Sequence, residues 1–118
     1  MARADFAFTH RFRVRYAEVD PQNVVFNARF LDYADIAITE YYRALDFRAL
    51  YPDAPLEFHV KRALVTWERP IFVDEMIDVM ARTTRAGTTS LTQLIEIHGA
   101  NDLEEDDLRA SVELVNVH

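Results

Sequence analysis

Residues 16–46 read YAEVDPQNVVFNARFLDYADIAITEYYRALD, a polar turn followed by the longest helical pattern in the chain. From residue 28 to residue 46 the polar side chains recur every three or four positions, which confines them to one arc of a helix. Apolar side chains fill the wider remainder. Asn27, just before this pattern, is a residue type that caps helices well. We therefore expect one long helix over residues 28–46, mostly surrounded by other structure because its apolar face is so wide, with one side left for solvent or a site.

Strand patterns flank this helix on both sides. Residues 8–16 alternate, with Phe8, His10 and three further apolar or aromatic residues on one side and Thr9 and three arginines on the other. Strand-like runs follow at residues 57–68, 76–85, 90–98 and 108–117, with a hairpin turn expected at 86–89. We expect the last four strands to form an antiparallel meander. This order predicts an α+β fold in which a five-stranded antiparallel sheet wraps around one long helix.

The composition restricts the class of protein. The chain has 118 residues, half of them hydrophobic, which suits a single domain over residues 1–118. Its net charge of −7 argues against binding to nucleic acid, which requires a basic surface. No apolar run approaches the roughly 20 residues that cross a bilayer, so we expect no membrane partner. The absence of cysteine fits a cytoplasmic protein, and the histidine spacing matches no metal site, so we expect no metal.

The segment from Tyr16 to Asp35 resembles the signature of the 4-hydroxybenzoyl-CoA thioesterase family, a family of hotdog-fold acyl-CoA thioesterases. That signature consists of an aromatic residue, an Asp, a Gly, two apolar residues, an aromatic residue and the start of the central helix. Asn23 replaces the usual Gly, and Asn is the residue other than Gly that best tolerates a positive φ. Residues 67–75 and 87–90 are similar to the family's strand connection and hairpin. The resemblance therefore extends from about residue 9 to residue 117.

The resemblance implies hydrolysis of a short-chain, medium-chain or aromatic acyl-CoA to free acid and CoA. Asp20 would attack the thioester or activate water, and the backbone amide of Asn27 would polarise the carbonyl group. The choice between nucleophile and general base stays open. Because CoA is part of the substrate, no separate cofactor is expected. The family also forms homodimers or homotetramers in which two sheets join edge to edge and the site lies between subunits.

Further candidate residues follow from their positions in the family pattern. Asp35 is a further candidate catalytic residue, because it stands where the family commonly has an acid and could reach the site or a neighbouring subunit, although it could equally be a solvated helix residue. The candidate substrate-binding residues are Asn23, Val25 and Phe26 in the turn, His59, Val60, Lys61 and Arg62 in the strand at 57–68, and Arg85 near the hairpin. His59 is a candidate for contact with the acyl or pantetheine part of a substrate held by the partner subunit. The candidates for the CoA phosphates are Lys61, Arg62, Arg82 and Arg85, each of which could instead be an ordinary surface charge. We interpret Glu18 as a surface acid, His10 as a core residue and His98 as a strand-end residue without a role.

Other interpretations of Asp20 and of the whole protein remain open. Asp20 could be a turn residue whose side chain bonds its own backbone before Pro21. The protein could be a non-catalytic acyl-CoA-binding hotdog module, although the carboxylate at Asp20 favours catalysis. It could also act on acyl-carrier-protein thioesters, which its acidic surface disfavours because the carrier is acidic too. A hotdog dehydratase pairs an Asp with a His in a loop pattern that this sequence lacks.

Overall fold

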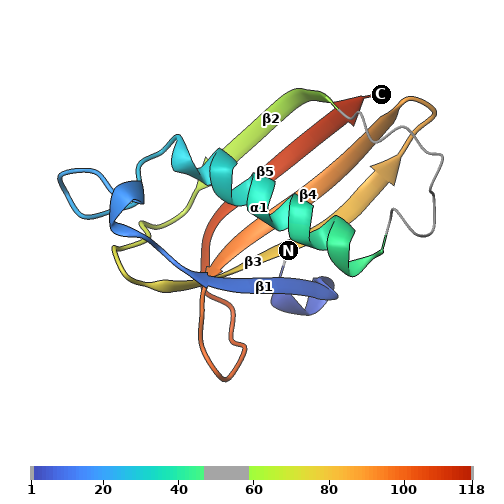
Figure 1. Cartoon of the computed structure of the whole chain (residues 1–118). Coiled ribbons are helices and arrows are strands. Elements are labelled where there is room, and N and C mark those ends of the chain that lie inside the picture. Colours follow the sequence, from blue (N-terminus) through green and yellow to red (C-terminus); the bar gives the residue numbers. More distant parts are fainter. Residues whose placement is uncertain (1, 47–58, 118) are drawn as a thin grey trace.

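The structure is a computed structural model that describes residues 2–46 and 59–117. Its elements are η1 (Arg3–Asp5), β1 (Phe8–Arg13), η2 (Tyr16–Glu18), α1 (Arg29–Ala44), β2 (His59–Trp67), β3 (Met76–Ala86), β4 (Ser90–Gly99) and β5 (Leu108–Val117). The strands form one antiparallel sheet in the order β1-β3-β4-β5-β2, and α1 lies across one face of it (Figure 1). The α+β fold with five antiparallel strands and one long helix is therefore as the sequence predicts.

The core lies between α1 and the face of the sheet that it covers. Phe30, Tyr33, Ala34 and Ala37 are the buried residues of the helix, and their spacing of three and four positions places them on one side. They meet alternate residues of the three central strands: Ile77, Val79, Ala81, Ile95, Ile97, Ala110, Val112 and Leu114. Among the described residues, the opposite side of α1 includes the exposed Leu31, Asp35 and Thr39. The helix thus leaves one side for solvent or a site, as expected.

The expected four-strand meander is wrong in one strand. β3, β4 and β5 follow one another as neighbours, but β2 pairs with β5 at the edge of the sheet. β1 pairs with β3 and forms the other edge. Residues 68–75 carry the chain from the end of β2 to the start of β3. The alternation of side chains along a strand predicts which residues face the core but not which strand lies beside it, so the sequence pattern could not detect this crossover.

Two expected boundaries also need correction. The first strand ends at Arg13, and Tyr16, expected on its inner side, is exposed because the chain turns into η2. The helix covers 29–44 instead of 28–46. Residues 57 and 58 of the expected second strand lie outside the described residues.

Within the part of the chain that the structure describes, no helix has the length and apolar character to span a membrane.

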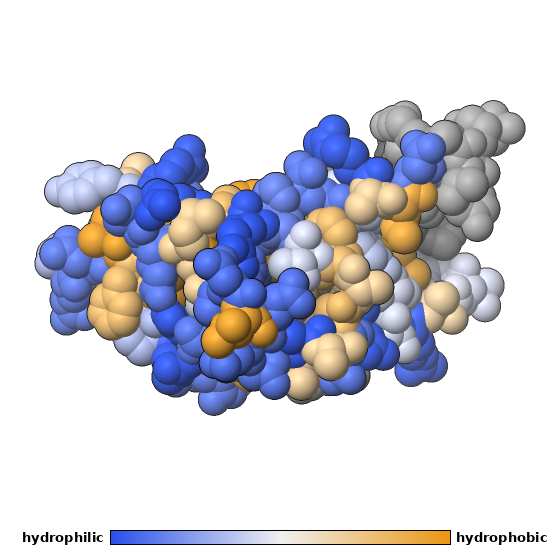
Figure 2. Space-filling model, turned by 90° about the horizontal axis from the view of Figure 1, so that it is seen from below, coloured by the Kyte–Doolittle hydropathy of each residue, from blue (hydrophilic) through white to orange (hydrophobic). Residues whose placement is uncertain are grey.

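The two edges of the sheet differ in chemistry. Along β1 the outward residues include the exposed Arg11 and Arg13, and the side of the molecule that carries β1 is mostly hydrophilic with small separate hydrophobic patches (Figure 2). Along β2, in contrast, the large apolar side chains of Val60, Leu64 and Trp67 are 58%, 49% and 50% exposed. A nine-residue edge strand with unpaired backbone groups and exposed apolar residues is suited to pairing with another strand.

Candidate active site

A short two-armed loop at the N-terminal end of α1 carries most of the predicted site. Val19 and Val25 form an isolated β-bridge, and the Asp20 amide donates to the carbonyl of Val24 at 2.9 Å. Asn23 closes the tip, where its amide donates to the Asp20 carbonyl at 2.9 Å and its φ is 63°. The positive φ is the conformation in which Asn is the best substitute for Gly. The expectation that Asn23 takes a positive φ in place of Gly is therefore confirmed, and its role in substrate binding stays a prediction.

Asp20 is half-buried on the first arm of this loop. Its Oδ1 accepts a hydrogen bond of 2.8 Å from the backbone amide of Gln22, the contact expected of an Asp that stabilises a turn. Its Oδ2 accepts no hydrogen bond from any described residue. The turn role and a chemical role are therefore compatible, because one oxygen orients the carboxylate while the other can meet water or substrate.

The second arm leads directly into the N-terminus of α1. At the start of α1, the Arg29 amide donates to the carbonyl of Phe26, and the Phe30 amide donates to the carbonyl of Asn27. The amides of Asn27 and Ala28 have no acceptor among the described residues, and no side chain caps the helix. The expected capping by Asn27 is therefore wrong: Ala28 is the N-cap residue. These free N–H groups and the positive end of the helix dipole can bind an anionic oxygen.

Glu18 lies beneath this loop and is only 5% exposed, so its interpretation as a surface acid is wrong. Its carboxylate accepts hydrogen bonds from Arg15 and from the hydroxyl of Tyr33, which is on the first turns of α1 and fully buried. Burial, followed by the negative charge of Glu18 and its hydrogen bond, raises the pKa of Tyr33 above the ordinary value. The sequence contains one clue that we missed: Arg15 and Glu18 are three residues apart, the spacing at which a side chain can bond a backbone amide across a tight turn.

The connection between β2 and β3 supports the loop from the other side. The Val25 amide donates to the carbonyl of Ile71 at 2.8 Å, and the Val73 amide donates to the carbonyl of Asn23 at 3.0 Å. The connection is in turn fixed by Arg109 of β5, which donates to the Pro70 carbonyl and forms a two-pronged ion pair with Glu75. The site loop therefore rests on backbone contacts to a segment that is itself anchored to the sheet.

A groove of about 440 Å³ runs along the open side of α1, between the helix and strands β2 and β5. Leu31, Ile38, Val60 and Ala63 give it an apolar lining, and the exposed Asp35 lies at its rim. One end has a polar floor in which Asn116 donates to Gln93 at 3.1 Å and Gln93 donates to the Tyr42 hydroxyl at 2.7 Å. Asp35 therefore borders a groove that begins near the site loop, although nothing places its carboxylate against Asp20.

Exposed aromatic side chains surround the site end of the molecule. Phe26 and Phe72 are each 52% exposed, and Trp67 packs edge-on against Phe30 with ring centroids 6.2 Å apart. Phe72 forms an isolated β-bridge with Val24, which brings it beside the loop. Val25, in contrast, is buried and belongs to the core. An apolar ligand or a partner chain would bury this aromatic surface.

The predicted basic residues lie at the opposite end of the molecule. His59 and Val60 pair with the end of β5, and Arg62 forms a 3.7 Å ion pair with Glu113. Arg85 is nine residues along β3 from its start at Met76, roughly 30 Å from the site end at about 3.3 Å per residue. A single chain therefore does not bring Lys61, Arg62 or Arg85 together with Asp20.

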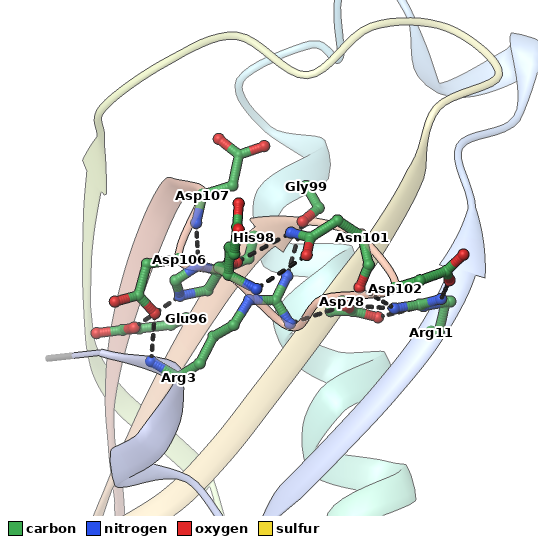
Figure 3. Close-up of polar contacts among 11 residues, drawn as sticks. Arg3, Arg11, Asp78, Glu96, His98, Gly99, Asn101, Asp102, Asp106 and Asp107 are labelled. Carbon is green, nitrogen blue, oxygen red and sulfur yellow. Dashed lines mark hydrogen bonds and ion pairs between the residues drawn. The ribbon is translucent and has the colours of Figure 1, made fainter.

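A second polar cluster lies on the face of the sheet away from α1 (Figure 3). His98, which we expected to be an unremarkable strand end, is buried with Glu96, and their side chains are 2.9 Å apart. Asp78 is buried beside them on β3 and binds Arg3 and Arg11. Among the described residues, no group of three or more His, Asp or Glu side chains has a metal-binding arrangement. This cluster shares no residue with the loop at Asp20.

Comparison with known proteins gives the family. Residues 22–105 match the model of the thioesterase superfamily. The chain is 30% identical over 106 residues to the acyl-CoA thioesterase YbgC of Haemophilus influenzae, covering 88% of this chain and 70% of that protein. A thioesterase from Thermus thermophilus, solved with coenzyme A and zinc, is 28% identical with a TM-score of 0.77, covering 95% of this chain and 78% of that one.

A thioesterase superfamily structure from Jannaschia has a TM-score of 0.81 but only 20% identity, over 97% of this chain and 70% of that one, and supports the fold alone. The match to the family model covers well over half of the chain, and the five-stranded antiparallel sheet with one helix is the fold of that family. The chain therefore belongs to the thioesterase superfamily, has the hotdog fold and is a thioester hydrolase.

Proposed function

We propose that this chain hydrolyses a short-chain, medium-chain or aromatic acyl-CoA to the free acid and CoA. The observation that carries the proposal is the half-buried Asp20 carboxylate, held by its own turn beside a helix N-terminus whose first amides are free. Its relative from Haemophilus influenzae is named an acyl-CoA thioesterase, and its relative from Thermus thermophilus binds coenzyme A. No resident cofactor is required, because CoA is part of the substrate.

The chemistry needs one attacking group and one set of donors. Asp20 either removes a proton from water, which then attacks the thioester carbonyl, or attacks it directly to give an anhydride that water cleaves. The developing oxyanion accepts a hydrogen bond from the Asn27 amide, with support from the helix dipole. The thiolate of CoA leaves and takes up a proton. Both routes use the same two groups, so the geometry supports each equally.

The surroundings of Asp20 suit an apolar acyl group that is carried by CoA. The exposed ring of Phe26 and the groove along α1 offer an apolar surface for the acyl part, with Asn23 and Val25 shaping the loop above it. Asp35 lies at the groove rim, which supports its role as a second carboxylate that acts near the bound acyl group. The net charge of −7 disfavours an acidic acyl carrier protein as the donor of the acyl group. Free CoA thioesters are therefore our first choice of substrate.

The basic residues that are candidates for CoA binding would come close to Asp20 only in a dimer. In a two-fold dimer whose β2 strands pair antiparallel at their free edges, the His59 end of one strand lies beside the Trp67 end of the other. Trp67 packs against Phe30 at the start of α1, next to the site loop. His59, Val60, Lys61 and Arg62 of one subunit would then face Asp20 of its partner and be available to the pantetheine and phosphates of CoA. Arg85 lies at the same end of the sheet as His59 and would approach from the same side.

The test compares wild type with Asp20→Asn by measuring thiol release from short, long and aromatic acyl-CoAs. Asp20→Asn keeps the shape and the turn acceptor but removes the charge, so kcat should fall by about 10² or more. Asp102→Asn is the matched control and should match wild type, because Asp102 is fully exposed on the β4–β5 connection and contacts Arg11 and no residue of the loop. Full activity in Asp20→Asn would overturn the site but keep the thioesterase. Binding of acyl-CoA by wild type without turnover would favour a non-catalytic binding module.

A further inference from the structure

Glu18 is a buried carboxylate with no place in the chemistry proposed above. Its Oε1 accepts hydrogen bonds from the Arg15 amide at 2.8 Å and from the Tyr33 hydroxyl at 3.0 Å. Its Oε2 accepts two more from the Arg15 guanidinium, at 3.2 and 3.0 Å. A carboxylate that is 5% exposed needs such partners, because an unpaired buried charge strongly destabilises a fold. The arrangement explains how Glu18 is tolerated but not what its burial achieves.

The backbone of Glu18 connects both halves of the proposed site. Its carbonyl accepts a hydrogen bond of 3.1 Å from the Phe26 amide, the residue directly before Asn27. The next residue along the chain, Val19, bridges to Val25, and Asp20 follows it. Together with the Val19–Val25 bridge and the Asp20 amide bond to Val24, Glu18 therefore fixes to each other the two arms of the loop, and its contact is the one nearest to Asn27.

Tyr33 links this point to the helix. It lies on the second turn of α1, is fully buried, and its ring packs edge-on against Phe12 and Phe30 with centroids 5.3 and 6.1 Å apart. Its ring position is thus set by core packing, and its hydroxyl reaches only Glu18 among the described residues. The hydrogen bond therefore ties the loop to the same helix whose N-terminus presents the free amides.

We propose that Glu18 and Tyr33 are positioning residues, a clamp that sets the placement of the Asp20 carboxylate relative to the Asn27 amide. The inference rests on the proposed function, and neither side chain touches the substrate. A displacement of about 1 Å between reacting groups can lower a rate by about 10², whereas loss of one hydrogen bond has a small effect on folding. Removing the Tyr33 hydroxyl should therefore lower turnover far more than it alters the fold.

Tyr33→Phe is the main test, because it removes one oxygen and keeps the ring contacts. Its kcat should fall by about tenfold or more while KM stays within about twofold of wild type. Tyr41→Phe is the matched control: Tyr41 is on the same helix, and its hydroxyl bonds Thr83 at 3.1 Å, away from the loop. It should leave kcat unchanged. Equal effects of the two substitutions, or a change in KM alone, would overturn the clamp.

Glu18→Gln and Glu18→Ala test the role of Glu18 as the acceptor of the Tyr33 hydrogen bond. In Glu18→Gln the amide oxygen still accepts a hydrogen bond from the Tyr33 hydroxyl, so this variant should keep more of the wild-type kcat than Glu18→Ala.

In an Asp20→Asn background, Tyr33→Phe should lower kcat little further, since a clamp acts through Asp20. A full additional loss in that background would show that Tyr33 acts independently and would overturn the proposal.

Amide hydrogen exchange separates failure of the clamp from failure of the proposed function. In Tyr33→Phe the Phe26 amide should exchange about tenfold or more faster than in wild type, while amides in the centre of β4 keep their rates. If wild type cleaves no acyl-CoA, the proposed function fails and this measurement alone decides the clamp. An unchanged Phe26 rate, or equal acceleration at every amide, would contradict it.

Discussion

Asp78 shows how a single buried charge makes stability depend on pH. It is 1% exposed on β3 and accepts hydrogen bonds from Arg11 at 2.8 and 3.1 Å and from Arg3 at 2.9 Å. Burial alone would raise the pKa of Asp78, but the hydrogen bonds and charges of Arg11 and Arg3 outweigh it and hold the pKa below its ordinary value. Such a group stabilises the fold above its unfolded pKa of about 4, and the contribution disappears as pH falls through the lower folded pKa.

We therefore predict that Asp78→Asn lowers the free energy of unfolding at pH 7 by about 3 kcal/mol, because it leaves the buried Arg3 side chain without its carboxylate. The difference from wild type should narrow as pH falls below about 4, since wild type then loses the same charge. Urea unfolding of both proteins at several pH values measures this difference. Asp102→Asn should unfold like wild type throughout, and a difference that stays constant down to pH 3 would contradict the prediction.

The residue scale also shows what the sequence could and could not predict about the site. Asn23 was predictable, because a turn position that needs a positive φ selects Gly or Asn whatever surrounds it. Glu18 was not, because a charged residue in a turn is normally solvated and its burial depends on Tyr33, fifteen residues away in the sequence. Contacts between distant segments leave no periodic pattern in the chain. Local backbone requirements can therefore be predicted from the sequence, whereas hydrogen-bond partners from distant segments cannot.

At the scale of elements, one side chain of β5 holds the connection that supports the site loop. The buried guanidinium of Arg109 donates to Glu75 at 2.8 and 2.6 Å, to Asp107 at 3.2 and 2.9 Å, and to the Pro70 carbonyl at 2.9 Å. Burial alone would raise the pKa of Glu75, but the hydrogen bond from Arg109, the Phe72 amide and the nearby positive charges lower it below the ordinary value. Arg109 thus binds both acidic partners, and Arg69 on the connection forms a further ion pair with Asp107.

Arg109→Met should lower the free energy of unfolding by about 3 kcal/mol, since it leaves the partly buried Glu75 carboxylate without the cation that pairs with it, whereas Asp107 keeps its ion pair with Arg69. It should also raise the pKa of Glu75 relative to wild type, because burial remains while the main opposing contact is lost. Chemical denaturation and an NMR titration of the Glu75 carboxyl measure the two effects. Arg43→Met is the control: Arg43 pairs with Glu40 on the helix surface and should contribute at most about 0.5 kcal/mol. Equal losses in the two variants would contradict the role of Arg109.

The elements themselves were largely predictable, and their arrangement was only partly so. The helix and the strands at 76–86, 90–99 and 108–117 follow from runs of period 3.6 and period two that agree with local propensity. The position of β2 beside β5 does not follow, because its pattern suits an edge beside either neighbour. What separates these possibilities is the crossover at residues 68–75, fixed by Arg109 and by the loop at Asn23. Nonlocal contacts again decide what the periodic pattern leaves open.

At the scale of the whole molecule, a single chain is incomplete in two ways that one assembly would resolve. The open side of α1 and the free edge of β2 expose apolar side chains, among them Leu31 and Val60. The basic residues predicted for CoA lie far from Asp20 in the same chain. Antiparallel pairing of two β2 edges would cover the apolar surface and bring His59 and Arg62 of one chain to the site end of the other. A monomer with full activity would leave both features unexplained.

We therefore predict that the protein sediments as a dimer or a larger even-numbered assembly of its 13.7 kDa chain, and that Leu64→Lys shifts it toward the monomer. Leu64 is 49% exposed near the middle of β2, where an added positive charge would face the Lys61 and Arg62 of the other strand. The sedimentation coefficient and the rate of thiol release from acyl-CoA should then both decrease, because the monomer lacks half of its CoA contacts. Leu103→Lys makes the same change at a 78% exposed loop residue and should alter neither. A Leu64→Lys monomer that hydrolyses acyl-CoA at the wild-type rate would show that each chain holds a complete site, and the basic end of β2 would then have no part in binding CoA.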